Sequence, residues 1–142
     1  MKRIVLDTNI LVAGLRSSNG ASFAILRLVA ERAVVPLVTT TLFLEYEAVL
    51  KRPEQCATTG FSTADMDAFL REFAALAEPV DVHFNWRPQS SDPADEMVLE
   101  AAVNGRADAL ITHNVRDLGA AAARFGISVM LPGLFLQGRN DE

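Results

Sequence analysis

The chain has 142 residues, the size of one ordinary domain, and half of them are hydrophobic. This composition excludes a chain that is disordered throughout, and the single Cys56 excludes an internal disulfide and suits a reducing compartment. The net charge of -5 argues against a broadly basic nucleic-acid surface, although acids gathered around a cation would leave the Lys and Arg residues available for phosphate.

The first half of the chain alternates β-branched runs with amphipathic segments, which predicts strands and helices in turn. The expected elements are a strand at Ile4-Val5-Leu6, a helix beginning after Asp7, a loop at 17–20, a helix over 22–32, a strand over 34–39 and a helix over about 41–51 that ends at Pro53. One of Thr39, Thr40 and Thr41 caps that last helix. A further helix over 62–77 begins at Ser62 with Asp65 in a capping-box position, and its apolar stripe is either core or an interface.

The second half of the chain continues the alternation. The expected elements are an edge strand at Val80-Asp81-Val82, a loop around Trp86, a helix from Asp92 to about Asn104, a strand over 107–112, a short helix through 124, a strand over 127–130 and a helix over 132–136. Strands that alternate with helices predict an α/β fold, a three-layer α/β/α sandwich around a mainly parallel sheet. We expect one domain over residues 1–137 and a flexible C-terminal tail over 138–142.

No apolar run approaches the length of a membrane span, and the run after Lys2 and Arg3 is too short for the core of a signal peptide. We therefore expect a cytoplasmic protein without membrane contact.

Asp7 is the most informative residue, because it follows a buried strand directly. It is either the cap of the next helix or a ligand at the carboxyl edge of the sheet, where ligands of open parallel sheets gather. Asp117 follows the strand that ends at Thr112, Asp92 and Asp95 begin the preceding helix, and Glu45 shares a helical flank with apolar Val49. A carboxylate on a packed face requires a partner or a metal ion.

Acids from four separate segments predict a site for Mg²⁺ or Mn²⁺, since these hard ions prefer oxygen ligands. Such a site activates water and stabilises in-line displacement at phosphorus. Zinc fits less well, because His83, His113 and Cys56 are isolated from one another in the sequence.

Four motifs resemble those of PIN-domain nucleases. They are Ile4-Val5-Leu6-Asp7-Thr8-Asn9-Ile10-Leu11-Val12, Leu44-Glu45-Tyr46-Glu47-Ala48-Val49-Leu50 with Lys51-Arg52-Pro53, Asp92-Pro93-Ala94-Asp95-Glu96, and Leu110-Ile111-Thr112-His113-Asn114-Val115-Arg116-Asp117-Leu118. The resemblance covers residues 3 to about 137 and is strongest to the VapC-related toxins of toxin-antitoxin systems.

The resemblance implies a Mg²⁺- or Mn²⁺-dependent endoribonuclease that holds one or two ions. By position, Asp7, Glu45, Asp95 and Asp117 match the catalytic and metal-binding acids of the family, and Asp92 is the alternative to Asp95. Thr8, Asn9, Thr112 and Asn114 are expected to support the site, and Asn114 stands where many relatives carry another acid. Arg16, Lys51, Arg52 and Arg116 are candidates for holding substrate phosphates. Each has an alternative interpretation, because exposed Arg and Lys residues on helices are usually solvating charges.

Two other functions fit parts of the sequence. A phosphatase that forms an aspartyl phosphate would need a second Asp two residues after Asp7, where this chain has Asn9. The second alternative is a catalytically weak or inactive PIN-like module that binds RNA or a protein partner. The resemblance further implies an RNA substrate, a cognate antitoxin and a homodimer.

Overall fold

The computed structural model describes residues 1–83 and 92–140, so the expected loop around Trp86 lies outside the described residues. Its strands form one five-stranded sheet in the order β3-β2-β1-β4-β5, and all of the strand pairs are parallel. The strands are β1 (Lys2–Leu6), β2 (Val34–Val38), β3 (Glu78–Pro79), β4 (Ala109–Ile111) and β5 (Val129–Met130). The predicted parallel sheet is confirmed.

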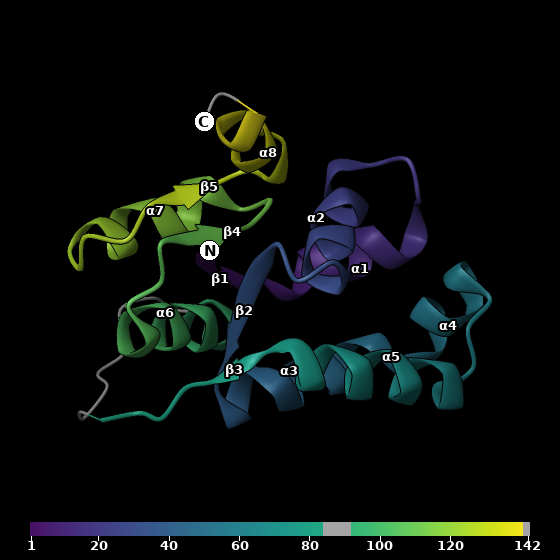
Figure 1. Cartoon of the computed structure of the whole chain (residues 1–142). Coiled ribbons are helices and arrows are strands. Elements are labelled where there is room, and N and C mark those ends of the chain that lie inside the picture. Colours follow the sequence, from purple (N-terminus) through teal and green to yellow (C-terminus); the bar gives the residue numbers. More distant parts are fainter. Residues whose placement is uncertain (84–91, 141–142) are drawn as a thin grey trace.

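Helices cover both faces of the sheet and extend beyond it (Figure 1). They are α1 (Thr8–Arg16), α2 (Ala21–Ala30), α3 (Thr40–Leu50), α4 (Pro53–Thr59), α5 (Thr63–Leu76), α6 (Pro93–Gly105), α7 (Val115–Ala123) and α8 (Pro132–Asn140). Helix α6 packs on β1, β2 and β4 and contacts α7, while α2 contacts β2 and α8 on the opposite side. The predicted α/β/α sandwich is therefore confirmed.

Strand β1 is the centre of the sheet and of the core. Ile4 pairs with Pro36 of β2 on one side and with Ala109 of β4 on the other. Ile4, Val5 and Leu6 are fully buried. A strand covered on both faces needs such a continuous apolar run. The parallel pairing places the carboxyl ends of β1, β2 and β4 at one edge, where Asp7, Thr39 and Thr112 follow them.

Helices α3 and α5 resolve two alternatives that the sequence left open. Thr39 caps α3, because its side chain accepts a hydrogen bond from the Leu42 backbone at 3.1 Å. Ser62 and Asp65 form the predicted capping box of α5. The apolar stripe of α5 is mainly core, since Met66, Leu70 and Phe73 are buried.

Most element ends differ from the predicted ones by one or two residues, and the largest differences concern α4, β3 and α8. Helix α4 was not predicted; Pro53 does end the preceding helix, but it also occupies the first turn of α4, which buries no residue and so has no apolar stripe. The edge strand is Glu78–Pro79 instead of 80–82, although the Val80 backbone still donates to the Val38 carbonyl at 2.9 Å. Helix α8 continues to Asn140 and includes residues 138–140, which the sequence assigned to a flexible tail.

No helix within the described ranges 1–83 and 92–140 has the length and apolar character needed to span a bilayer.

An ion pair joins β1 to the edge strand β3. The Arg3 guanidinium donates to both carboxylate oxygens of Glu78, and the two side chains are 35% and 44% exposed. Arg3 also reaches the carbonyl of Arg106 at 3.3 Å, after the end of α6. The hydrogen bond and charge of Arg3 lower the pKa of Glu78.

Glu78→Gln should therefore lower the free energy of unfolding at neutral pH by about 0.5 kcal/mol, since solvent screens an exposed pair. Because the pKa of Glu78 is lower in the folded state, the contribution is present above the unfolded pKa and is lost as the pH falls through the folded pKa. Urea unfolding at neutral and acidic pH measures the effect. Glu72→Gln on the exposed side of α5 is the control, and equal losses in both variants would contradict the prediction.

Candidate functional site

The Asp7 carboxylate lies at the carboxyl end of β1 and is only 8% exposed. Asp7 occupies the N-cap position of α1, but its side chain makes no capping hydrogen bond. Its Oδ2 atom instead accepts from the Thr112 hydroxyl at 2.6 Å and from the Asn9 side-chain amide at 3.2 Å. The carboxylate is thus held by Thr112 after β4 and by Asn9 of α1, and helix capping does not account for it.

Thr112 and Asn9 connect this carboxylate to the turn between β4 and α7. Thr112 is fully buried, and while its hydroxyl donates to Asp7 it accepts from the Asn114 backbone at 2.9 Å. Asn9 accepts from the His113 backbone at 3.3 Å through its Oδ1 atom. The turn of residues 112–114 is therefore tied to both Asp7 and α1.

The pKa of Asp7 is raised, chiefly because burial disfavours the charged form. Hydrogen bonds from the Thr112 hydroxyl and the Thr8 backbone oppose the rise, as does the charge of His113. The nearby charge of Asp92 adds to the rise. A buried carboxylate next to a second acid is the kind of group that a bound cation would stabilise.

Asp92 and Asp95 have different environments at the start of α6. Asp92 is exposed and caps the helix, since its Oδ1 atom accepts from the Ala94 backbone at 2.9 Å. Asp95 lies in the first turn of α6 and is 6% exposed. The structure thus assigns the helix cap to Asp92 and buries Asp95.

Glu45 is half-buried on α3. It lies one turn after Thr41, whose hydroxyl donates to Glu100 of α6 at 3.5 Å, so Glu45 is on the side of α3 that faces α6. The next residue, Tyr46, is fully buried and donates its hydroxyl to the Leu6 carbonyl at the end of β1. Burial and the charge of Asp7 raise the pKa of Tyr46 well above its ordinary value. This turn of α3 therefore lies over the same strand end as Asp7.

Asp117 lies in the first turn of α7 and is exposed, and half-buried Asn114 is the N-cap residue of that helix. In the part of the chain that the structure describes, no three His, Cys, Asp or Glu side chains are grouped closely enough to hold a metal ion directly. The structure thus brings Asp7 close to Asp92 and buries Asp95, without assembling the four predicted acids into a ready ligand set.

The predicted basic residues differ in how strongly they are held. Lys51 pairs with Asp67 at 2.5 Å and with Glu47 at 3.8 Å, which connects α3 to α5. The Arg16 guanidinium donates to the Gln55 side chain at 3.2 Å, which connects α1 to α4. Arg52 and Arg116 are exposed, and Arg116 is adjacent to Asp117. The contacts of Lys51 and Arg16 favour structural roles for these two residues.

Sequence reasoning did not assign roles to Tyr46 or Ser22. It weighed His113 as a general base against a hydrogen-bonded structural residue and favoured the structural role. Tyr46 is the only Tyr of the chain, but it stands between Glu45 and Glu47, so the sequence gives no local signal that its hydroxyl is buried. Ser22 and His113 meet across 91 positions, at 3.1 Å between Oγ and Nε2, and no spacing in the sequence indicates that contact.

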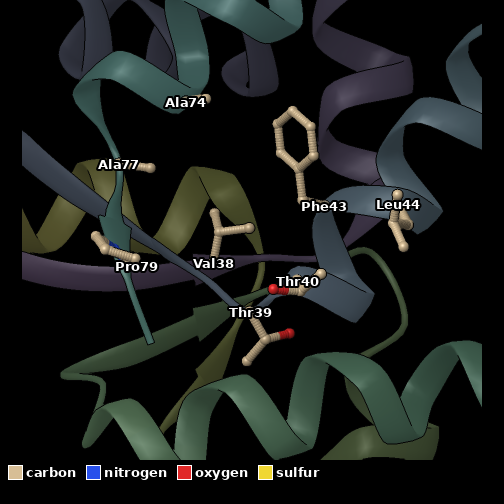
Figure 2. A pocket seen from close by; sticks show the side chains of 8 residues that line it. All are labelled: Val38, Thr39, Thr40, Phe43, Leu44, Ala74, Ala77 and Pro79. Carbon is tan, nitrogen blue, oxygen red and sulfur yellow. The ribbon is translucent and has the colours of Figure 1, made fainter. Parts of the chain in front are cut away.

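An apolar pocket of about 270 Å³ lies between the start of α3 and the end of α5 (Figure 2). Its lining consists of Val38, Thr39, Thr40, Phe43, Leu44, Ala74, Ala77 and Pro79. None of these side chains is ionisable, so the pocket itself offers no acid-base or metal chemistry.

Comparison with known families identifies the chain. A family model described as a PIN domain matches residues 3–116. The chain belongs to the PIN-domain family. PIN domains are generally nucleases, and they typically use divalent metal ions.

The PIN fold of this chain is also found among solved structures. The structure of this chain is similar to that of a chain in the structure of FitAB bound to an IR36 DNA fragment, with a TM-score of 0.56. The two sequences are 18% identical, and the match covers 91% of this chain and 94% of that one. At this identity the likeness concerns the fold. A comparison with curated proteins finds no match.

Asp7→Asn should raise the free energy of unfolding at neutral pH in metal-free buffer by about 1 kcal/mol, because it removes a charge that burial disfavours. The pKa of Asp7 is higher in the folded state, so the wild type loses stability as the pH rises from the unfolded pKa through the folded pKa, and the variant does not. The difference should vanish below the unfolded value of about 3.9.

Urea unfolding in the presence of a chelator, measured across this pH range, checks the prediction. Asp81→Asn, at an exposed position after β3, is the matched control and should show little change at any pH. A less stable Asp7→Asn variant at neutral pH would show that the hydrogen bonds to the carboxylate outweigh its desolvation.

Proposed function

We propose that this PIN domain is a metal-dependent endoribonuclease and the toxin of a toxin-antitoxin pair in the cytoplasm. The observation that carries the proposal is the buried Asp7 carboxylate, which Thr112 and Asn9 hold at the carboxyl edge of the sheet. A bound cation would stabilise such a buried carboxylate. Membership of a family of nucleases indicates the class of reaction.

The donor set fits Mg²⁺ or Mn²⁺, because the side chains at this edge offer oxygen ligands and the buried acid has an acidic neighbour in Asp92. Asp7, Glu45, Asp95 and Asp117 are the residues that would hold one or two ions. Mg²⁺ commonly keeps several of its waters, so acids that are too far apart for a direct ligand set can still contribute through water. When bound, the ion would activate water and offset the charge of the phosphodiester.

The residues of the chain have distinct parts in the proposed reaction. Thr112 and Asn9 orient Asp7, Thr8 adds a backbone hydrogen bond, and Asn114 holds the Thr112 hydroxyl in place. Exposed Arg116 would hold a phosphate of the RNA next to Asp117. In the overall reaction, water oxygen bonds to phosphorus, the bond from phosphorus to the 3′ oxygen breaks, and that oxygen takes up a proton. The products are a 5′-phosphate and a 3′-hydroxyl.

A catalytically weak PIN module that binds RNA or a protein is the second candidate. The observation in its favour is the absence, within residues 1–83 and 92–140, of three acids close enough to hold an ion directly.

Purified protein with Mn²⁺ should cleave RNA, and Asp7→Asn should reduce the rate by at least about 100-fold, since even residues that only support metal ligands contribute 10–100-fold. Sequencing of the RNA ends from a mixed RNA substrate measures both the rate and the end chemistry. Asp81→Asn should cleave like the wild type. Intact RNA with both wild type and Asp7→Asn would favour the binding module.

Calorimetry with Mn²⁺ separates the two acids of α6. Asp95→Ala should weaken Mn²⁺ binding by at least about tenfold. Asp92→Ala should weaken Mn²⁺ binding less than Asp95→Ala does, since it removes only a nearby charge, but it should lower the free energy of unfolding by about 1 kcal/mol because it removes a helix cap. Loss of Mn²⁺ binding in Asp92→Ala alone would make Asp92 the ligand.

The protein partners belong to the same proposal. A cognate antitoxin and a homodimer are proposed because the motifs resemble those of VapC-related toxins. Exposed apolar side chains that could take part in such contacts include Leu44, Leu131 and Leu134. Light scattering of the purified chain would decide between a monomer and a dimer.

A further inference from the structure

Ser22 is a buried polar residue outside the predicted motifs. It lies in the first turn of α2, and its side chain is 5% exposed. A hydroxyl in such a position requires a hydrogen-bond partner. That partner is the Nε2 atom of His113, at 3.1 Å, in the turn between β4 and α7.

Helix α2 is a firm support for this contact, because it packs very closely on α1. A Cβ atom on Gly14 of α1 would lie 2.5 Å from Leu26 Cδ1 and 3.3 Å from the Ser22 carbonyl oxygen. A larger residue at Gly14 would displace the Leu26 side chain and press on the Ser22 backbone, so α1 and α2 are closely packed next to Ser22.

His113 is held at two points. Its ring meets Ser22 of α2, and its backbone donates to Asn9 of α1, which in turn donates to Asp7. Its two neighbours belong to the same network, since Thr112 donates to Asp7 and Asn114 donates to Thr112. His113 is therefore the central residue of a turn whose other two residues contact the buried acid or its partner.

This turn leads directly into the first turn of α7, where Asp117 lies. Asp117 is exposed, and no core packing of its own side chain fixes it relative to Asp7. The turn at 112–114 connects the two acids, because it is hydrogen-bonded to Asp7 through Thr112 and continues directly into α7. The anchoring of the turn therefore acts together with the packing of buried Leu118 and Ala122 of α7 in placing Asp117.

We propose that Ser22 and His113 are positioning residues of the nuclease site, which anchor the 112–114 turn to α2 and so set the place of Asp117 relative to Asp7. The inference rests on the proposed function, because Asp117 is a metal ligand only under that proposal. Neither residue touches the reacting atoms in this role.

Four variants test the role of the contact. Ser22→Ala removes the hydroxyl, and His113→Phe keeps a ring but removes the nitrogen. His113→Gln keeps a polar atom near the place of Nε2 and is the conservative replacement. Ser18→Ala, at an exposed position in the α1–α2 loop, is the matched control.

The first readout is hydrogen exchange of the metal-free protein, which requires no activity. Ser22→Ala and His113→Phe should each speed amide exchange in residues 112–118 by about tenfold or more, with the rest of the chain unchanged, since only this turn loses an anchor. His113→Gln should exchange like the wild type. Unchanged exchange of 112–118 in Ser22→Ala would overturn the proposal whether or not the protein cleaves RNA.

The second readout is the Mn²⁺ concentration for half-maximal RNA cleavage. Ser22→Ala and His113→Phe should each raise it by about tenfold, as for other residues that support metal ligands, while KM for RNA stays the same. The double variant should match the single variants, because both remove one shared contact. If His113 instead bound RNA directly, Ser22→Ala would leave cleavage unchanged and His113→Phe would raise KM, and the proposal would be wrong. RNA cleavage by the wild type separately tests the proposed function.

Discussion

The burial of the Asp7 carboxylate at the end of the central strand is the constraint on which the site depends. A charge in this position is costly, and the rise in its pKa reflects that cost. The fold accommodates it with donors from two elements, the Thr112 hydroxyl after β4 and the Asn9 amide in α1. A protein that needed only a helix cap here would keep the side chain in solvent. A buried carboxylate whose pKa is raised in this way is typical of functional sites.

The rest of the site is arranged around the same strand end. Tyr46 holds α3 against the Leu6 carbonyl at the end of β1, and the half-buried Glu45 next to it lies on the side of α3 that faces α6. Helix α6 brings the charge of Asp92 near Asp7 and buries Asp95. Membership of the PIN family connects this arrangement to nuclease chemistry. The structure therefore fixes the position of Asp7 by hydrogen bonds. Under the proposed function, a bound ion would bring Glu45, Asp95 and Asp117 into contact with the same site.

Much of the fold was predictable because its signals are local. The apolar run Ile4–Leu6 and the turn residues that separate the segments predict alternating strands and helices, and parallel pairing follows from that alternation. Helix α4 was missed because it buries no side chain and so shows no periodicity. The end of α8 was placed too early, since polar residues near a terminus predict fraying whether or not the helix continues.

For the site, the sequence by itself determined which residues follow each strand. It also determined that they share one edge of the sheet, because parallel strands have their carboxyl ends on the same side. It placed Asp7 and Thr112 at that edge, but it left Asp7 open between a cap and a ligand. Only the tertiary structure decided that Asp7 is buried, that Asp92 caps α6 while Asp95 is buried, and that Ser22 anchors His113. The physical reason is that burial and hydrogen bonding between distant segments depend on tertiary packing, which local sequence patterns do not predict.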